Sequence, residues 1–117
     1  MGSLTKTEVA EAFCQHRFAE TYESLDENVE WRLVGASTIR GKADVIAACE
    51  ESAAELAKLA TSFSRFRVVE AADCAIVESE AEYKTGDETS RVASCDIFDF
   101  EDDQVTAIAS FTVELGQ

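Results

Sequence analysis

Apolar residues follow a helical spacing in the first half of the chain and an alternating spacing in the second half. Either Thr5 or Thr7 can cap a first helix, and Glu8 completes a capping box with Thr5. The inward positions of this helix recur every three or four residues: Val9, Ala12, Phe13, His16 and Ala19 or Glu20. Residues 20–28 then favour a second short helical turn, which ends in the polar run DEN. We therefore expect two helical segments to open the chain.

The next stretch predicts one strand, one short connection and one long helix. Residues 29–35 alternate in polarity, with Val29, Trp31 and Leu33 on one face of a strand. Residues 36–40 lie between two glycines and predict a short extended or turn segment. Residues 42–60 are rich in alanine, and their apolar side chains gather on one side: Val45, Ile46, Cys49, Ala53, Leu56 and Leu59 or Ala60. This one-sided pattern predicts the long helix of the protein.

The apolar period changes to two after residue 60, which is typical of strands. Three short polar turns divide the remainder into four predicted strands, at residues 61–71, 75–83, 89–100 and 105–115. The chain contains no proline, and it shows no repeat or linker that would separate two domains. Helices followed by a meander of strands favour the α+β class. We expect a single domain that spans residues 1–117.

Charge and composition exclude several classes of partner. The chain has 24 acidic and 10 basic residues, and its formal net charge of -14 repels phosphate backbones, so we expect no nucleic-acid partner. No apolar run approaches the length of about 20 residues that a membrane span needs, so we expect no membrane insertion. The four cysteines are dispersed and no signal-peptide pattern precedes them, which predicts reduced thiols in a cytoplasmic protein. With a single histidine, we expect neither a metal nor another cofactor.

Two segments, NVEWRLVGASTIRGKADVIA and SCDIFDFEDDQVTAIASFTVEL, resemble the SnoaL-like branch of the nuclear-transport-factor-2-like superfamily. In that family a strand leads through a glycine to an Arg-Gly pair and a helix, and an acidic hairpin joins the last two strands. The resemblance implies a cone, in which a strongly curved antiparallel sheet wraps the long helix and the N-terminal helices around a cavity. It also implies a homodimer formed through the sheet. Its members include steroid isomerases, polyketide cyclases, limonene epoxide hydrolases, dehydratases and non-enzymatic proteins.

Asp96 is the main candidate for chemistry. Alternation along residues 89–100 places it on the same face as two phenylalanines, within the set Val92, Ser94, Asp96, Phe98 and Phe100. If that face lines a pocket, loss of solvation raises the pKa of the carboxyl, which makes it either a proton donor or a base closer to neutrality. The resemblance to steroid isomerases implies that Asp96 donates a hydrogen bond to a developing oxyanion. The alternative is that Asp96 accepts hydrogen bonds and only fixes the pocket wall.

Two departures from the family pattern bear on mechanism. Arg32 stands where the steroid isomerases carry their base, and Ser94 stands where the epoxide hydrolases carry an arginine. Arg32 either pairs with Asp96 or meets an anionic ligand group, or else it lies exposed or forms a salt bridge in a dimer. His16, the one imidazole, is a second catalytic candidate because it titrates near neutrality, although a packed and hydrogen-bonded role is the alternative.

The remaining expectations concern the pocket lining. We expect the ligand to be contacted by Trp31, Leu33, Phe66, Ser94, Phe98 and Phe111. Tyr22 and Tyr83 could each direct a hydroxyl group into the pocket, but their positions favour an ordinary amphipathic role. From the residues and the resemblance together, we expect first a domain whose pocket takes a small apolar molecule, with a filled pocket as the alternative. The protein is either a general acid–base enzyme of the isomerase, cyclase or dehydratase type, acting on a carbonyl or hydroxyl group, or a non-catalytic ligand-binding or homodimeric assembly module.

Overall fold

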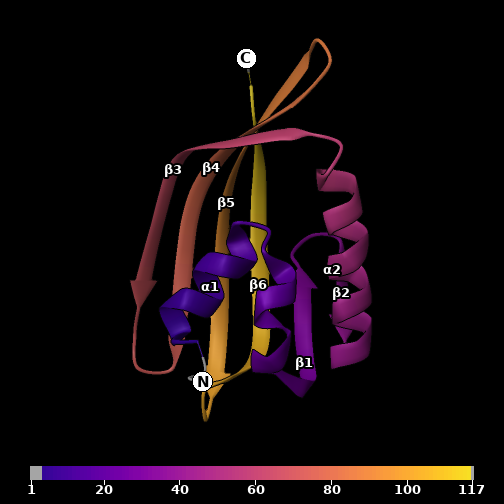
Figure 1. The fold of residues 1–117 in the computed structure, drawn as a ribbon. Helices are drawn as coiled ribbons and strands as arrows, with labels where there is room; N and C mark the ends of the chain where they lie inside the picture. Colours follow the sequence, from indigo (N-terminus) through magenta and orange to yellow (C-terminus); the bar gives the residue numbers. More distant parts are fainter. Residues whose placement is uncertain (1–3, 117) are drawn as a thin grey trace.

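A curved sheet covered on one side by helices forms the protein in a computed structural model that describes residues 4–116 (Figure 1). The predicted domain of residues 1–117 extends beyond this part at both ends, so residues 1–3 and 117 lie outside the described residues. The elements follow one another as α1 (Lys6–Cys14), the 3₁₀ helix η1 (Phe18–Ser24), β1 (Leu25–Leu33), β2 (Ser37–Arg40), α2 (Lys42–Leu56), β3 (Ala60–Glu70), β4 (Cys74–Thr85), β5 (Glu88–Glu101) and β6 (Gln104–Leu115).

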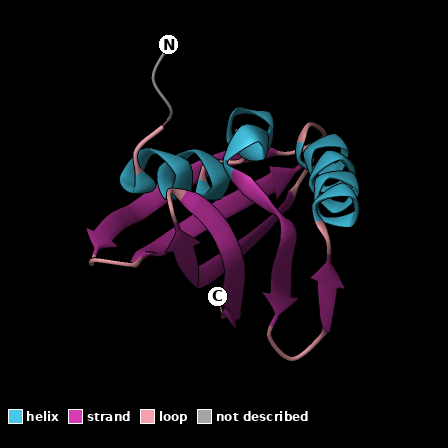
Figure 2. Cartoon of the chain, turned by 90° about the horizontal axis from the view of Figure 1, so that it is seen from below, coloured by secondary structure: helices cyan, strands magenta, loops and turns pink. Residues whose placement is uncertain are grey.

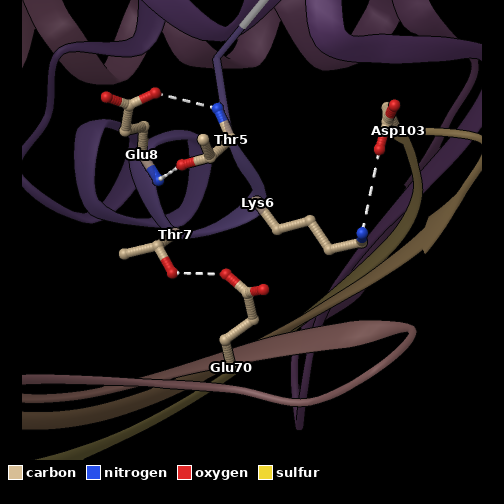
Figure 3. A network of polar contacts seen from close by, with 6 residues as sticks. All are labelled: Thr5, Lys6, Thr7, Glu8, Glu70 and Asp103. Carbon is tan, nitrogen blue, oxygen red and sulfur yellow. Dashed lines mark hydrogen bonds and ion pairs between the residues drawn. The ribbon is translucent and has the colours of Figure 1, made fainter.

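Helix α1 is closed at both ends by local hydrogen bonds. The Thr5 side chain accepts from the Glu8 backbone N–H at 3.1 Å, and the Glu8 carboxylate accepts from the Thr5 N–H at 2.9 Å, which is the predicted capping box (Figure 3). At the other end the His16 N–H donates to the Phe13 carbonyl, and the Arg17 N–H donates to the Ala12 carbonyl at 2.8 Å. This pair of bonds is a Schellman motif, with His16 in the left-handed position at φ 69°.

The six-stranded sheet has the order β2-β1-β6-β5-β4-β3. Its strand pairs are antiparallel except for β1 and β6, which run parallel, so the expectation of a purely antiparallel sheet is wrong and the sheet is mixed. The meander of β3 to β6 returns the chain to β1 and lays the last strand beside the first long one in the same direction (Figure 1). The α+β class itself is confirmed.

Residues 25–28 correct the prediction of a helical turn over residues 20–28. The helical part is η1, which ends at Ser24, and strand β1 already begins at Leu25. Leu25 and Val29 are buried, while the polar residues between them face outward, with the Asp26 carboxylate accepting from the Asn28 N–H at 2.9 Å. Polarity in this run therefore marks the solvent side of a strand rather than the end of a helix. The long helix α2 also ends earlier than predicted, at Leu56.

One residue of β6 breaks the regular alternation of the sheet. Val105 pairs with Phe100 and Ala107 pairs with Asp99, which leaves Thr106 between them without a cross-strand partner. This is a β-bulge, and it allows Val105 and Ile108 to be buried on the same inner face although they are an odd number of residues apart. The Thr106 hydroxyl donates to the Asp99 carbonyl at 3.3 Å, which holds the bulge closed.

The helices lie together on the inner face of the sheet (Figure 2). Helix α1 contacts β3, β4 and β5, and α2 contacts β1 and β2. Between them a core of fully buried side chains fills the narrow part of the molecule, including Val9, Leu25, Val29, Val45, Val77, Phe98, Val105 and Ile108. In residues 4–116 no helix is both long and apolar enough to cross a bilayer.

Candidate functional site

A cavity of about 210 Å³ remains between the helices and the inner face of the sheet. Helix α1, the turn after it and η1 supply one wall, α2 supplies a second, and strands β1 and β3 to β6 supply the rest. Its lining combines aromatic rings with hydroxyl groups and one carboxyl group: Phe13, Cys14, His16, Phe18, Trp31, Leu33, Ser52, Leu56, Phe63, Ser79, Tyr83, Ser94, Asp96, Ser110 and Thr112. Most of the polar groups of the lining lie on the strands, and the aromatic rings come from both the helices and the sheet.

Asp96 of β5 is held in this cavity by donors from two other elements. The Ser110 hydroxyl, on the neighbouring strand β6, donates to Oδ1 at 2.5 Å. The Cys14 thiol, at the end of α1, donates to Oδ2 at 3.5 Å. Ser110 is itself fixed, because the Trp31 Nε1–H donates to its oxygen at 3.0 Å. The chain from Trp31 through Ser110 to Asp96 therefore sets the orientation of the carboxyl group.

Burial dominates the electrostatics of Asp96. Loss of solvation raises the pKa of its carboxyl above the ordinary aspartate value, and the hydrogen bonds from Ser110 and Cys14 offset part of that rise. The pKa of the Cys14 thiol is raised as well, first by its burial and then by the nearby Asp96 charge. Cys14 therefore stays protonated and serves as a donor to Asp96 rather than as a nucleophile.

His16 reaches the cavity from the left-handed position that ends α1. Its ring lies 5.8 Å from that of Phe18 and 5.9 Å from that of Phe63, measured between ring centroids. Burial lowers the pKa of the imidazole, which favours the neutral form. Glycine is the usual residue at this helix position because it has no Cβ. The left-handed conformation is unfavourable for a histidine, which has a Cβ, but it directs the imidazole toward the cavity.

Tyr83 lines the cavity, although its position near a predicted strand end favoured an ordinary role. Strand β4 continues to Thr85, so the inward alternation of Val77, Ser79 and Ala81 extends to Tyr83. Burial, followed by the Asp96 charge, raises the pKa of its phenol. Tyr22 differs, because its hydroxyl donates to the Glu50 carboxylate at 2.5 Å and joins η1 to α2 outside the cavity lining.

The predicted ligand-binding residues separate into two groups in the structure. Trp31, Leu33 and Ser94 line the cavity, together with the catalytic candidates Asp96 and His16. Phe98 and Phe66 do not belong to the lining. Phe98 is fully buried in the core and meets Phe13 edge to face, and Phe66 stands behind Phe63 in the same way. These two rings support the walls instead of facing the interior.

The position of Phe111 corrects the sequence prediction. A strict alternation from Val105 would carry Phe111 to the inner face, but the bulge at Thr106 adds one residue and turns it outward. Phe111 is 39% exposed and lies outside the cavity lining. Arg32 is likewise exposed, on the face of β1 away from the cavity, and no ion pair with Asp96 forms in the described residues.

Several lining residues were not predicted from sequence. Cys14 and Ser110, the two donors to Asp96, were missed because the bulge and the end of α1 place them. Ser79 could have been found, since it follows the alternation of Val77 along β4. Across the part of the chain that the structure describes, no three His, Cys, Asp or Glu side chains come together as metal ligands.

Comparisons with known proteins agree on the family and the fold. The family model for SnoaL-like domains matches residues 7–108. A nuclear-transport-factor-2-like protein of unknown function from Cytophaga hutchinsonii is 25% identical and has a TM-score of 0.80, with 90% of this chain and 93% of that chain covered. No curated protein sequence matches the chain significantly.

Two more distant structures share the fold at lower identity. An LEH-like epoxide hydrolase from M. tuberculosis is 16% identical with a TM-score of 0.69, and the match covers 92% of this chain and 82% of that chain. A proposed polyketide cyclase from Pseudomonas putida is 17% identical with a TM-score of 0.69, and the match covers 92% and 91%. The cone of helices on a curved sheet is therefore the shared framework.

Proposed function

The chain belongs to the SnoaL-like domain family, and from that premise we propose that its cavity binds a small apolar molecule with which Asp96 exchanges a proton. The ligand carries a carbonyl or hydroxyl group, and the reaction is of the isomerase, cyclase or dehydratase type. One observation carries this proposal. Asp96 faces an aromatic-walled cavity while Ser110 and Cys14 hold both of its carboxyl oxygens.

The environment of Asp96 suits general acid–base work. A group that both donates and accepts a proton is most effective when its pKa lies near the working pH, and burial moves the pKa of Asp96 in that direction. When protonated, Asp96 can donate to a carbonyl oxygen. When ionised, it can accept a proton from the carbon next to that carbonyl. In an isomerisation the proton removed from one atom is returned to another, so no co-reactant is needed.

His16 is the second group that we assign to the reaction. Its pKa is lowered by burial, so the neutral imidazole is available as a proton acceptor in the same cavity. The carboxyl group of Asp96 on β5 can donate a proton, and the neutral imidazole of His16 after α1 can accept one. The two groups lie on different walls of the cavity. Phe13, Phe18 and Trp31 exclude water from the space between those walls.

The proposal is tested by hydrogen exchange into a simple ketone. We expect the protein to accelerate exchange of the α-hydrogens of cyclohexanone in D2O, followed by proton NMR. Asp96→Asn removes the titrating group and should lower the protein-dependent rate by about 10²- to 10⁴-fold. Asp99→Asn is the matched control, because Asp99 lies on the same strand and is exposed. A wild-type rate equal to that of buffer, or equal rates for the two variants, would contradict the proposal.

Ligand binding without turnover is the second candidate, and one observation favours it. Arg32, which stands where related isomerases carry their base, is exposed, and Asp96 is the one acidic side chain among the described residues that line the cavity. In this case the protein would bind cyclohexanone without accelerating hydrogen exchange. Fluorescence of Trp31, the one tryptophan of the chain and part of the cavity wall, would report that binding.

A further inference from the structure

Three hydroxyl groups form a row across the polar wall of the cavity. Ser79 of β4 pairs in register with Ser94 of β5, and Ser94 pairs in turn with Thr112 of β6. All three belong to the cavity lining. Because adjacent strands lie about 4.8 Å apart, the row extends over roughly 10 Å. It runs from the buried Ser79 through the half-buried Ser94 to the exposed Thr112, that is, from the interior toward the opening.

These hydroxyl groups differ from that of Ser110 in their bonding. The Ser110 hydroxyl donates to Asp96 and accepts from Trp31. Within residues 4–116, the side chains of Ser79, Ser94 and Thr112 make no hydrogen bond to another protein group. None of their hydroxyl oxygens is both fully buried and without a hydrogen-bond partner, so each remains accessible. A hydroxyl group offers one donor and two acceptor positions. The row therefore presents unused donors and acceptors to whatever occupies the cavity.

The row and Asp96 define two polar points at a fixed separation. Ser94 and Asp96 lie two residues apart on the same face of β5, which places them about 7 Å from one another along the strand. Apolar side chains, among them Phe13, Leu56 and Phe63, complete the lining. A cavity of about 150 Å³ is known to accept a benzene ring. The 210 Å³ available here suits one six-membered ring with small substituents at both ends.

We propose that the cavity selects an uncharged, single-ring ligand that carries oxygen at two opposite ring positions. One oxygen faces Asp96 and Ser110, and the other bonds to the row of Ser79, Ser94 and Thr112. An anionic ligand is disfavoured because, among the described residues of the lining, no lysine or arginine is present to balance a carboxylate or phosphate. A cationic ligand is disfavoured because both oxygens of Asp96 already accept hydrogen bonds from Ser110 and Cys14. The inference rests on the proposed function only in placing the reacting oxygen at Asp96.

Two probes that differ in one oxygen test this assignment. Titrations followed by Trp31 fluorescence compare 4-hydroxycyclohexanone with cyclohexanone on the wild-type protein. One hydrogen bond contributes about 0.5–1.5 kcal/mol, so we expect the hydroxylated ring to bind roughly 2- to 12-fold more tightly for each bond that it makes to the row. In the double variant Ser94→Ala/Thr112→Val this preference should fall, because Ser79 alone remains of the row, and the affinity for cyclohexanone should change less than that for 4-hydroxycyclohexanone.

The control is a double variant of the same chemistry away from the cavity. Ser62→Ala/Thr61→Val changes two exposed residues of β3 and should retain the preference. Ser79→Ala is a second test at the buried end of the row. The proposal would be overturned if the wild type bound both probes with equal affinity, or if the cavity variants lost affinity for both probes by the same factor. If the protein prefers 4-hydroxycyclohexanone but does not accelerate hydrogen exchange, the proposed function is refuted and the ligand class is supported. If it accelerates exchange but shows no preference between the probes, the ligand class is refuted and the proposed function is supported.

Discussion

At the level of single residues, Asp96 links the site to the stability of the protein. In the unfolded chain an aspartate titrates near pH 3.9, and burial raises the pKa of Asp96 in the folded state. The folded protein therefore holds this proton more strongly than the unfolded chain does. Its contribution to stability is complete below about pH 3.9 and is lost as the pH rises through the folded pKa.

The variant Asp96→Asn should show this linkage directly, because asparagine cannot ionise. We expect the free energy of unfolding of the wild type, relative to that of the variant, to fall as the pH rises from about 3 to about 7. Urea denaturation at several pH values measures the difference. His16, whose pKa is lowered, contributes with the opposite sign, but it is present in both proteins. A difference that does not vary with pH would mean that the carboxyl is not desolvated.

His16 should show the cost of its backbone position. At φ 69° a residue with a Cβ is strained by about 1 kcal/mol relative to glycine. Both His16→Gly and His16→Ala remove the ring contacts with Phe18 and Phe63, so the difference between them isolates the backbone. We expect His16→Gly to be more stable than His16→Ala by about 1 kcal/mol in urea denaturation. The reverse order would exclude the left-handed conformation.

Sequence patterns locate Asp96 better than they locate its partners. Its parity on β5 follows from simple alternation with Ser94 and Phe98, and the structure places it inward. Ser110 was not predicted, because it faces Asp96 only through the bulge at Thr106. Cys14 was predicted only to be a reduced thiol, since nothing in its local pattern reveals a carboxyl 82 positions away. Contacts between distant segments are therefore the part that local patterns miss.

At the level of elements, helix α1 matters because it carries Cys14 and leads into His16. Thr5→Ala removes the capping bond to the Glu8 N–H and should lower the free energy of unfolding by about 1 kcal/mol. Thr7→Ala is the matched control. It breaks the exposed hydrogen bond to Glu70, drawn in Figure 3, and should cost less than about 0.5 kcal/mol. Equal losses in thermal or urea denaturation would contradict the role of the cap.

The elements themselves were largely predictable, and the exceptions have physical reasons. The four strands of the meander and helix α2 appear where periodicity places them, within a few residues at their ends. Helix α1 is shorter than predicted, because the left-handed His16 ends it after Cys14 instead of letting it continue to Ala19 or Glu20. The start of β1 was mistaken for a helical turn because its polar residues 26–28 face solvent next to η1. The parallel pairing of β1 with β6 joins the β1–β2 pair to the meander of β3 to β6, and no local signal encodes it.

At the level of the whole molecule, we propose that the homodimer expected from the sequence forms through the outer face of the sheet. Phe111 and Val113 are 39% and 61% exposed there, and they pair in register with Cys95 and Ala93. Nearby, Arg65 and Arg67 form ion pairs with Glu78, so this face offers both charge signs on a strongly acidic protein. An apolar centre bordered by both signs is self-complementary.

We expect the protein to form the homodimer that the family resemblance implies, and we expect Phe111→Lys to convert it to a monomer, because a charge at the centre of a symmetric interface faces its own copy. Native mass spectrometry or light scattering measures the change. Val34→Lys is the control, since Val34 has the same 39% exposure but lies in the turn between β1 and β2. A wild-type protein that remains monomeric at high concentration would rule out this interface.

The extra residue at Thr106 decides which side chains of strand β6 face the cavity and which face outward. Substitutions at Ser110 and Thr112 should alter ligand binding in the cavity, and those at Phe111 and Val113 should alter only the association with a second copy of the chain. A mutational scan of this strand that measured ligand binding alone, or dimerisation alone, would therefore find no effect at every second position. In a relative without the extra residue, the inward and outward positions of the last strand would be interchanged after the bulge. Alignment columns in this strand would then compare a cavity residue of one protein with an outer-face residue of the other.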